Sequence, residues 1–544
     1  MKSRLENNKI KPDVFTSLSF INLLVLGIIT IILNRIAGEE AIGYGAGSIL
    51  MFIFASSVYL ICFERAVCRM VRLRAKRNQY RNASKNMKFF SIIAMISGLL
   101  LSIVFILVSG PFIKIITGSS MGQMIFLCAA PSFFFMSIIG VIRGYMYGFG
   151  YTYPYFISSL IQIFTSVILG FLFAFLTHGY GVKIGNLIHV EETASVYSAA
   201  GVMAGLSVGT FVSMIYILIA FYLRRHEMKH IIEGGEMIII DNGNETFPIL
   251  GPLLIFYALP VLIFIIDEVV YTNHKAGSTD AIEAYGIFYG RFLVVLIIFA
   301  SICILPFVKK WYQINVRIDK LDLGYAGNRF CGLMVYESLI AVPFSTFSMF
   351  MAGTVTTCIF GKENDAATGF WVIGMPLIGF ICLWAILTWI LVKQGRESIL
   401  ITASLVSFVA HIISLILFMG VMGKGLHAII VALYVQLIIY DAICFIALYQ
   451  ILKLKNTFLY IVIGKIIVCS LLTSVVVMLL DKLLVNIIGE PLTLILSIIV
   501  FVFVYYNLLL ISGTIGRRDL ERMPLGNIFA IYAGAIGLLK GDKR

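Results

Sequence analysis

Ionisable side chains inside long apolar runs are the residues of this sequence best suited to chemistry, and Arg291 is the clearest of them. A planar guanidinium in such a place can hold a phosphate or diphosphate group through paired hydrogen bonds. It can equally form a structural ion pair with Asp267 or Glu268, which lie near the end of the preceding apolar run. Because the ion pair does not exclude the phosphate contact, we predict Arg291 as a substrate-binding residue.

Acidic and amide side chains occur in other apolar runs. Placing a charged side chain at the centre of a membrane helix costs about 2.5–3.5 kcal/mol, so such residues usually have a function. Glu337 and Asp441 each fit a proton or cation site, and each equally fits a hydrogen bond to a neighbouring helix. We predict Gln162 and Glu337 as further substrate-binding residues, and Asp441, Asp267 and Glu268 as candidate sites for a coupling ion.

Three further features are expected to be structural. His411 lies near the middle of an apolar run, where we expect a buried neutral imidazole that is hydrogen-bonded across helices. Lys465 is expected to extend its ammonium group to the membrane surface. Gly201, Gly205 and Gly209 recur at every fourth position, and this spacing predicts the close packing of two helices.

The amino-acid composition indicates that these residues lie in a membrane protein. The chain has 544 residues, of which 60% are hydrophobic and 13% charged, a balance that no water-soluble core accommodates. The nine cysteines are scattered without a CxxC pair or a histidine partner, so we expect neither a metal site nor a cofactor. No polar segment is long enough for a soluble enzyme domain, and we do not expect an enzyme.

The apolar runs predict an all-α integral membrane protein. A helix needs about 20 apolar residues to cross a bilayer. We expect fourteen such spans, at residues 15–35, 42–63, 89–110, 122–142, 154–177, 198–223, 249–271, 285–307, 332–353, 370–391, 398–421, 427–450, 459–480 and 491–513. An even number of spans places both termini on the same side of the membrane.

Lysine and arginine are distributed unevenly between the segments that join these spans. With the N-terminus inside, 32 lie in cytoplasmic segments, counting Arg143 between spans four and five, and 7 lie in outer segments. This bias predicts that both termini and the segment Arg65–Lys88 are cytoplasmic in a plasma membrane. It also accounts for the net charge of +13 without a nucleic-acid partner, and membrane lipids are the expected neighbours of the basic segment.

Two stretches that lie 245 residues apart look like copies of each other. They are Tyr44-Gly45 with Ile53-Phe54-Ala55-Ser56, and Tyr289-Gly290 with Ile298-Phe299-Ala300-Ser301. A repeat of that length contains about six spans, and an even number makes the halves parallel repeats, as in two-lobed transporters. We therefore predict an N-terminal lobe over 1–235, a C-terminal lobe over 236–455, and two further helices with a cytoplasmic tail over 456–544. The polar segment Arg224–Phe247 is the expected linker.

The fourth span and its exit carry a more specific pattern: Ala130-Pro131-Ser132-Phe133, then Gly140-Val141-Ile142-Arg143-Gly144-Tyr145-Met146-Tyr147-Gly148, then Pro154. It resembles the signature of bacterial polysaccharide biosynthesis membrane proteins of the stage V sporulation protein B type. These are cousins of the lipid II flippases in the multidrug/oligosaccharidyl-lipid/polysaccharide exporter superfamily. Weaker similarities are Tyr289-Gly290-Arg291, Ile359-Phe360-Gly361 and Met523-Pro524-Leu525-Gly526, so the resemblance extends over residues 12–535.

The chain also departs from this family. Thr30 occupies a position in the first span where family members usually have a basic residue. In the lipid II flippases, arginines of the cavity are thought to hold the pyrophosphate. The resemblance leaves Arg291 as the plausible counterpart of those arginines in this chain.

The resemblance implies a flippase or exporter in the cytoplasmic membrane of a bacterium. It would move a polyprenyl-diphosphate-linked saccharide, or a related cell-envelope lipid, by alternating access, with envelope glycosyltransferases as partners. A cation-coupled multidrug exporter of the same superfamily is the alternative, and the acidic residues within spans keep it open. A membrane-embedded polysaccharide polymerase ranks lower, because the outer segment Gly179–Ser195 contains Glu191 and Glu192 but no arginine.

Overall fold

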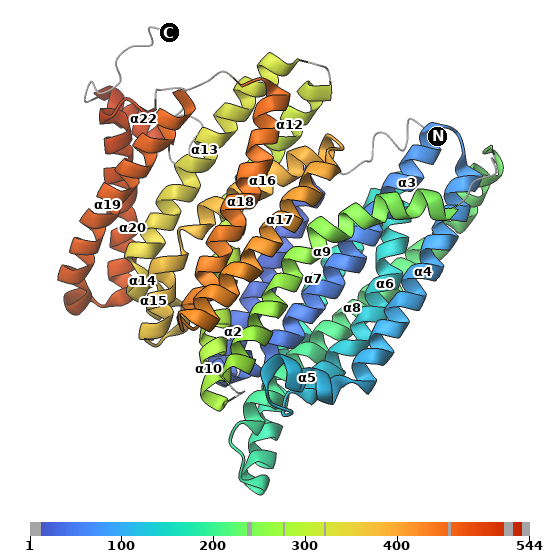
Figure 1. The fold of residues 1–544 in the computed structure, drawn as a ribbon, viewed down its shortest axis with the longest axis horizontal. Helices are drawn as coiled ribbons and strands as arrows, with labels where there is room; N and C mark the ends of the chain where they lie inside the picture. Colours follow the sequence, from blue (N-terminus) through green and yellow to red (C-terminus); the bar gives the residue numbers. More distant parts are fainter. Residues whose placement is uncertain are drawn as a thin grey trace. The chain divides into compact units, whose positions relative to one another are not determined.

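A computed structural model describes residues 12–236, 242–275, 278–319, 322–454, 458–515 and 526–535. Throughout these residues the regular secondary structure is helical, and no strand occurs among them. The apolar runs explain this, because in lipid each backbone N–H and C=O group needs a partner within its own segment. The predicted all-α membrane architecture is confirmed (Figure 1).

The chain divides into two compact units. Unit 1 is Met1–Val295 with Arg396–Tyr440, and unit 2 is Leu296–Gly395 with Asp441–Arg544. Helix α18 (His427–Leu452) contributes residues to both units. These boundaries differ from those of the two lobes that the repeat predicts, and the relation of the lobes by a repeat stays a prediction.

Unit 1 contains long helices joined by short turns. In chain order they are α2 (Pro12–Ser56), η1 (Ser57–Phe63), α3 (Glu64–Lys76), α4 (Tyr80–Leu107), α5 (Ser109–Thr117), α6 (Gln123–Phe149), α7 (Thr152–Ile188), α8 (Thr193–Glu233), α9 (Asn242–His274), α10 (Thr279–Ile287), η2 (Phe288–Leu293), the start of α11 (Val294–Ile304), α17 (Glu397–Leu415) and η4 (Ile416–Val421). The segments η1, η2 and η4 are π-helical.

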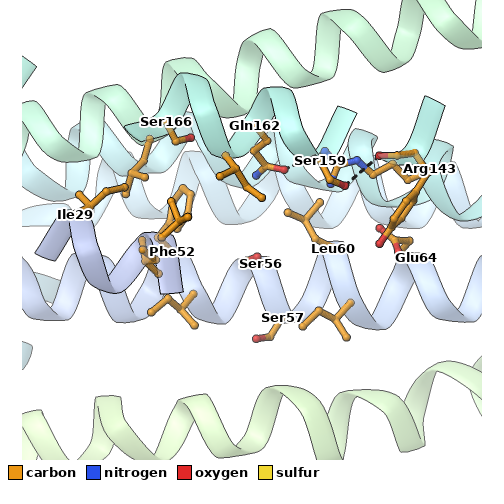
Figure 2. A pocket seen from close by; sticks show the side chains of 17 residues that line it. Ile29, Phe52, Ser56, Ser57, Leu60, Glu64, Arg143, Ser159, Gln162 and Ser166 are labelled. Carbon is orange, nitrogen blue, oxygen red and sulfur yellow. Dashed lines mark hydrogen bonds between the residues drawn. The ribbon is translucent and has the colours of Figure 1, made fainter. Parts of the chain in front are cut away.

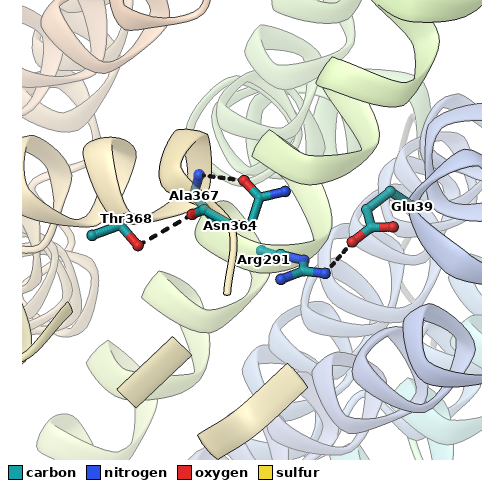
Figure 3. A network of polar contacts seen from close by, with 5 residues as sticks. All are labelled: Glu39, Arg291, Asn364, Ala367 and Thr368. Carbon is teal, nitrogen blue, oxygen red and sulfur yellow. Dashed lines mark hydrogen bonds and ion pairs between the residues drawn. The ribbon is translucent and has the colours of Figure 1, made fainter. Parts of the chain in front are cut away.

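Unit 2 is built around α13 (Leu323–Phe350). Its other elements are η3 (Leu305–Phe307), α12 (Val308–Asp319), α14 (Ala352–Phe360), α15 (Asp365–Gly374), α16 (Leu377–Lys393), α19 (Phe458–Ile488), α20 (Glu490–Ile511) and α22 (Gly526–Ala535). Helix α13 packs against α12, α15, α16 and α19. Asn364 caps α15, because its Oδ1 atom accepts a hydrogen bond of 2.9 Å from the Ala367 backbone N–H (Figure 3).

Twelve helical runs in the described residues are long and apolar enough to cross a membrane, or thirteen if the bent pair α15–α16 is one span. The first run, Leu24–Lys76, includes residues of both predicted spans 15–35 and 42–63. Within it, Gly38 has φ +80° and ψ −176°, a conformation that glycine adopts without strain and that interrupts α2. The predicted number of fourteen spans therefore stays a prediction.

Two residues that we assigned to connecting segments lie inside helices. Glu64 begins α3, which continues η1 without a break, and its side chain is buried. Arg143 lies within α6 and is 3% exposed. The helices therefore continue past the predicted ends of spans two and four, and the cytoplasmic location of both residues stays a prediction.

Close packing of α7 against α8 is confirmed for the glycine series of α8. A Cβ atom built at Gly205 would lie 2.3 Å from the Gly170 backbone nitrogen, and one at Gly209 would lie 2.3 Å from Ser166 Oγ. Glycine is therefore required for the two backbones to approach this closely. The same two helices supply one wall of the cavity described next.

Candidate functional site

A cavity of about 180 Å³ lies within unit 1 (Figure 2). Its walls come from α2, η1, α3, α6, α7 and α8, with the side chains of Val25, Leu26, Ile29, Phe52, Ile53, Ser56, Ser57, Leu60, Ile61, Glu64, Arg143, Tyr155, Ser159, Gln162, Ile163, Ser166 and Leu206. A second cavity of unit 1, lined by Ile29, Leu33 and Val202 among others, has a volume of about 10 Å³.

One end of this cavity is polar, and Arg143 is its centre. The Arg143 Nε atom donates a hydrogen bond of 3.0 Å to Ser158 Oγ. Its Nη2 atom donates to Gln162 Oε1 at 3.0 Å and to Ser213 Oγ at 2.8 Å. These acceptors come from α7 and α8, so the guanidinium of α6 is fixed by two neighbouring helices.

Glu64 supplies the opposite charge at the same end. The Tyr155 hydroxyl donates a hydrogen bond to Glu64, and the charge of Arg143 stabilises the Glu64 carboxylate. The Arg143 guanidinium carbon lies 5.9 Å from the centre of the Tyr155 ring. A buried cation and a buried anion thus face one another with an aromatic side chain against both, as Figure 2 shows for Glu64 and Arg143.

The sequence brings these charges together through glycines of α6. A Cβ atom built at Gly140 would lie 2.0 Å from the Tyr59 carbonyl oxygen, and one at Gly144 would lie 2.4 Å from the Glu64 carbonyl oxygen. The glycines on either side of Arg143 therefore let α6 lie directly against η1 and the start of α3. The π-helical turns of η1 precede Glu64, and such turns occur frequently at functional sites.

The other end of the cavity is apolar, with Ile29, Phe52 and Leu206 among its lining residues. Most ligand sites combine apolar walls with a few convergent polar groups that fix orientation. This cavity can accept a molecule that has hydrogen-bonding groups at one end and apolar parts at the other. Because Arg143 and Glu64 carry opposite charges, the polar end does not demand a strongly charged ligand.

Gln162 is the predicted substrate-binding residue that the structure places at this cavity. Arg291 and Glu337 are not among the described residues that line it. The sequence analysis missed Arg143 and Glu64 as site residues. The available signal was the spacing of Gly140, Gly144 and Gly148, which marks α6 as a packed helix through Arg143 and beyond.

Arg291 forms an ion pair with a residue that we did not predict. Its Nη2 atom contacts Glu39 Oε1 of α2 (Figure 3), and Arg291 is 4% exposed. The ion pair of Arg291 is thus with Glu39 and not with Asp267 or Glu268, the alternative that the sequence left open, because α2 and α10 cross closely beside this position. A Cβ atom built at Gly286 would lie 2.1 Å from the Glu39 carbonyl oxygen, so the two backbones touch there.

Asp267 and Glu268 of α9 have different surroundings. Asp267 Oδ1 lies 2.8 Å from His411 Nε2 of α17, which confirms the prediction of a buried histidine bonded across helices. Glu268 is fully buried, and the backbone of Gly47 in α2 is the hydrogen-bonding group beside its carboxylate. The roles of Asp267 and Glu268 as coupling-ion sites stay predictions.

Glu337 and Asp441 both belong to unit 2, and each is 4% exposed. Lys465 donates a hydrogen bond of 3.0 Å to the Ser512 carbonyl oxygen just after the end of α20. Within the described residues, no group of three or more His, Cys, Asp or Glu side chains is arranged to hold a metal ion. The nine cysteines are free thiols.

Solved membrane transporters share this arrangement of helices. The lipid II flippase MurJ, in an inward closed conformation, aligns with a TM-score of 0.60 over 91% of this chain and 97% of its own, at 13% identity. An inward-facing multidrug resistance MATE family transporter of the MOP superfamily aligns with a TM-score of 0.58 over 80% and 96%, at 10% identity. The MATE multidrug transporter DinF-BH aligns with a TM-score of 0.51 over 82% and 98%, at 13% identity.

These similarities concern the whole fold. No family model matches the chain, and no curated protein sequence matches it either. The structural alignments nevertheless cover most of this chain and nearly all of each transporter. The chain is therefore a multi-pass membrane protein with the fold that the lipid II flippase MurJ and the MATE transporters share.

Proposed function

We propose that this protein is a flippase that moves a polyprenyl-diphosphate-linked saccharide, or a related cell-envelope lipid, across the cytoplasmic membrane by alternating access. The observation that carries the proposal is the similarity to a lipid II flippase over 91% of the chain. Family resemblance in the span of Arg143 supports the same substrate class. The protein would act by changes of shape and without covalent chemistry.

The chemistry of the cavity supports an amphipathic cargo. The polar groups around Arg143, Glu64 and Gln162 offer both donors and acceptors for the hydroxyl groups of a saccharide. The apolar walls suit the first part of a lipid chain, whose remainder can stay in the bilayer. Arg291, within its ion pair with Glu39, remains our candidate contact for the diphosphate.

A flipping assay with purified full-length protein tests this proposal. Proteoliposomes would contain a fluorescent polyprenyl-diphosphate-linked saccharide in both leaflets, and a membrane-impermeant quencher would be added outside. We expect the protein to expose the inner-leaflet lipid to the quencher, which protein-free vesicles do not. If the lipid stays protected with well-folded protein, this substrate class is wrong.

A matched pair of variants on α2 tests the place of the cavity. Ser56→Phe adds a large side chain to the cavity wall, whereas Ile28→Phe adds one at a position of α2 that is 48% exposed. We expect Ser56→Phe to slow flipping at least tenfold and Ile28→Phe to leave it unchanged. Equal flipping by both variants would remove the cavity from the proposed path.

The second candidate is a cation-coupled multidrug exporter. It is favoured by the TM-score of 0.58 with a MATE transporter and by the buried acidic residues Glu268, Glu337 and Asp441. This function predicts efflux of a lipophilic cationic dye from the same proteoliposomes when an ion gradient is imposed. Dye efflux without lipid flipping would favour the multidrug exporter over the flippase.

A further inference from the structure

A row of side chains on α2 faces a row on α7 in unit 1, and the two rows line two cavities. The cavity at Arg143 and the smaller cavity share Ile29, so they follow one another along the same helices. The α2 row has the spacing of one helix face and consists of Val25, Leu26, Ile29, Ile32, Leu33 and Ile36. The α7 row includes Ser159, Gln162, Ile163, Ser166, Phe171 and Ala174. We call these facing rows the α2–α7 seam. At 1.5 Å per residue, its α7 side covers about 22 Å of a hydrocarbon core of about 30 Å.

Polarity falls along the α2–α7 seam. Glu64 and Arg143 stand at one end of the larger cavity, and Ile29 lies at the other end, where the smaller cavity follows (Figure 2). Every side chain that lines the smaller cavity is aliphatic or aromatic. In the predicted orientation, the polar end is the one nearer the cytoplasm. A lipid of the inner leaflet has the same polarity, because its head group lies at the cytoplasmic surface and its chain points toward the centre of the bilayer.

The two neighbours of α7 hold it in different ways. Helix α8 lies directly against the α7 backbone, because glycines of both helices meet at Gly170 and Gly205. On the other side, the α2 side chains of the seam are all aliphatic and form no hydrogen bonds. Apolar contact between membrane helices has no hydrophobic driving force, because lipid chains are equally apolar. A hydrocarbon chain that entered between α2 and α7 would therefore replace the contacts of α2 with contacts of the same kind.

Phe171 lies at the edge of the α2–α7 seam. Its side chain lines the smaller cavity and is nevertheless 49% exposed. Phe164 and Ile168 of the same helix are more exposed and line neither cavity, so they mark the face of α7 that meets the lipid. Phe171 thus stands between the smaller cavity and the bilayer. A chain that left the cavity beside Phe171 would pass from apolar protein directly into hydrocarbon.

We propose that the α2–α7 seam binds the hydrocarbon chain of the cargo lipid, which reaches the bilayer beside Phe171 while the saccharide occupies the polar end at Arg143. The inference rests on the proposed function, because it takes the cargo to be a polyprenyl-linked saccharide. The diphosphate would then lie between the two ends, where Ser56 and Ser166 of the cavity wall can donate hydrogen bonds. Arg291 lines neither cavity, so its predicted contact with the diphosphate belongs to a different step of the cycle. The seam has one row of side chains on each helix, which fits the single chain of a polyprenyl lipid rather than the paired chains of a phospholipid.

Photolabelling of the natural full-length protein in proteoliposomes tests this proposal. The probe is a polyprenyl-diphosphate-linked disaccharide with a diazirine group in the part of the chain nearest the diphosphate. After illumination, mass spectrometry of peptides locates the label. We expect it on the α2–α7 seam, and several times less of it on Ile92, Leu99 and Leu100 of α4, which are exposed but line neither cavity. An excess of the same lipid without the diazirine should remove the label from the seam, whereas an excess of phosphatidylglycerol should not.

Two adjacent positions of α7 supply a matched pair of variants. Val167 lines the smaller cavity, and Ile168 is exposed and lines neither cavity. Val167→Trp fills the α2–α7 seam, so we expect it to lower the labelling of the seam and the rate of flipping several-fold. Ile168→Trp places the same side chain toward the bilayer and should leave both measurements unchanged.

The natural protein alone decides the proposal, even if a variant fails to fold. Label that is spread equally over the seam and α4, or that phosphatidylglycerol removes from the seam, would overturn it. Labelling and flipping are separate measurements, so the two proposals can fail separately. Flipping without labelling of the seam would leave the flippase function and discard the seam. Specific labelling of the seam without flipping would leave the chain-binding site and discard the flippase function.

Discussion

At the residue scale, the buried charges of Arg143 and Glu64 are expected to contribute jointly to the stability of the protein. The two groups interact through their charges, while the hydrogen bonds of Arg143 go to Ser158, Gln162 and Ser213, so removing one charge leaves the other less compensated in a buried place. Replacing both partners with neutral residues of similar size avoids that cost. The stability of this pair is therefore expected to depend on the two residues jointly.

We predict that Arg143→Met and Glu64→Gln each destabilise the protein strongly, and that the double variant recovers most of the loss. Thermal unfolding of the purified single and double variants would measure this in a double-mutant cycle. Ser102→Ala, a change at another buried polar residue of unit 1, serves as the control. If the two single effects simply add in the double variant, the charges do not depend on each other.

Arg291 gives a second prediction at this scale. If its guanidinium contacts a diphosphate, Arg291→Ala should abolish flipping while the protein still accumulates, and Arg291→Lys should restore it only in part, because an ammonium group cannot make the paired contact. Glu39→Gln removes the ion pair but keeps the arginine, so it should retain flipping. A purely structural pair predicts the reverse: low protein abundance in both alanine and glutamine variants, with recovery when the two charges are exchanged.

The elements that hold this site depend on helix-to-helix distance. Alanine at an interior helix position normally stabilises by about 1 kcal/mol relative to glycine. Gly144→Ala should nevertheless destabilise the protein, because its Cβ atom would lie 2.4 Å from the Glu64 carbonyl oxygen. Gly379→Ala in α16, where no heavy atom lies within 4 Å of a Cβ, is the matched control and should be neutral or stabilising. Unfolding temperatures that change equally for both would contradict the close approach of α6 to α3.

Sequence reasoning succeeded where an element is defined by its own residues. The apolar runs predicted the helices, and the glycine series of α8 predicted its contact with α7, because both signals are local. It failed where the partner lies far along the chain. Glu39 is 252 positions from Arg291 in the sequence, so no local sequence pattern predicts their ion pair. The cavity also depends on residues from six elements, although Gln162 was identified from its polar character alone.

At the scale of the whole molecule, the distribution of charge predicts the orientation. Even if Arg143 is left out of the count, lysine and arginine are far more numerous in the predicted cytoplasmic segments than in the outer segments. We expect a cysteine at Asn78, in the exposed turn between α3 and α4, to be protected from impermeant thiol reagents in intact cells. Cys128 and Cys358 should first be replaced by serine, because they are the native cysteines that are only half-buried. Efficient labelling from outside would reverse the orientation.

The π-helical segment η1 has a consequence for how this chain is compared with others. The stretch that we predict to be repeated ends at Ser56, and η1 begins at the next residue, Ser57. A π turn holds more residues than an α turn, so it acts as an insertion inside a continuous helix. Everything after it is rotated, by about 100° for each extra residue. A gap-free alignment of this helix with an uninterrupted α-helix would therefore pair residues from different helix faces beyond Ser56. By the same geometry, deleting one residue of η1 would turn Glu64 away from Arg143 without shortening α3.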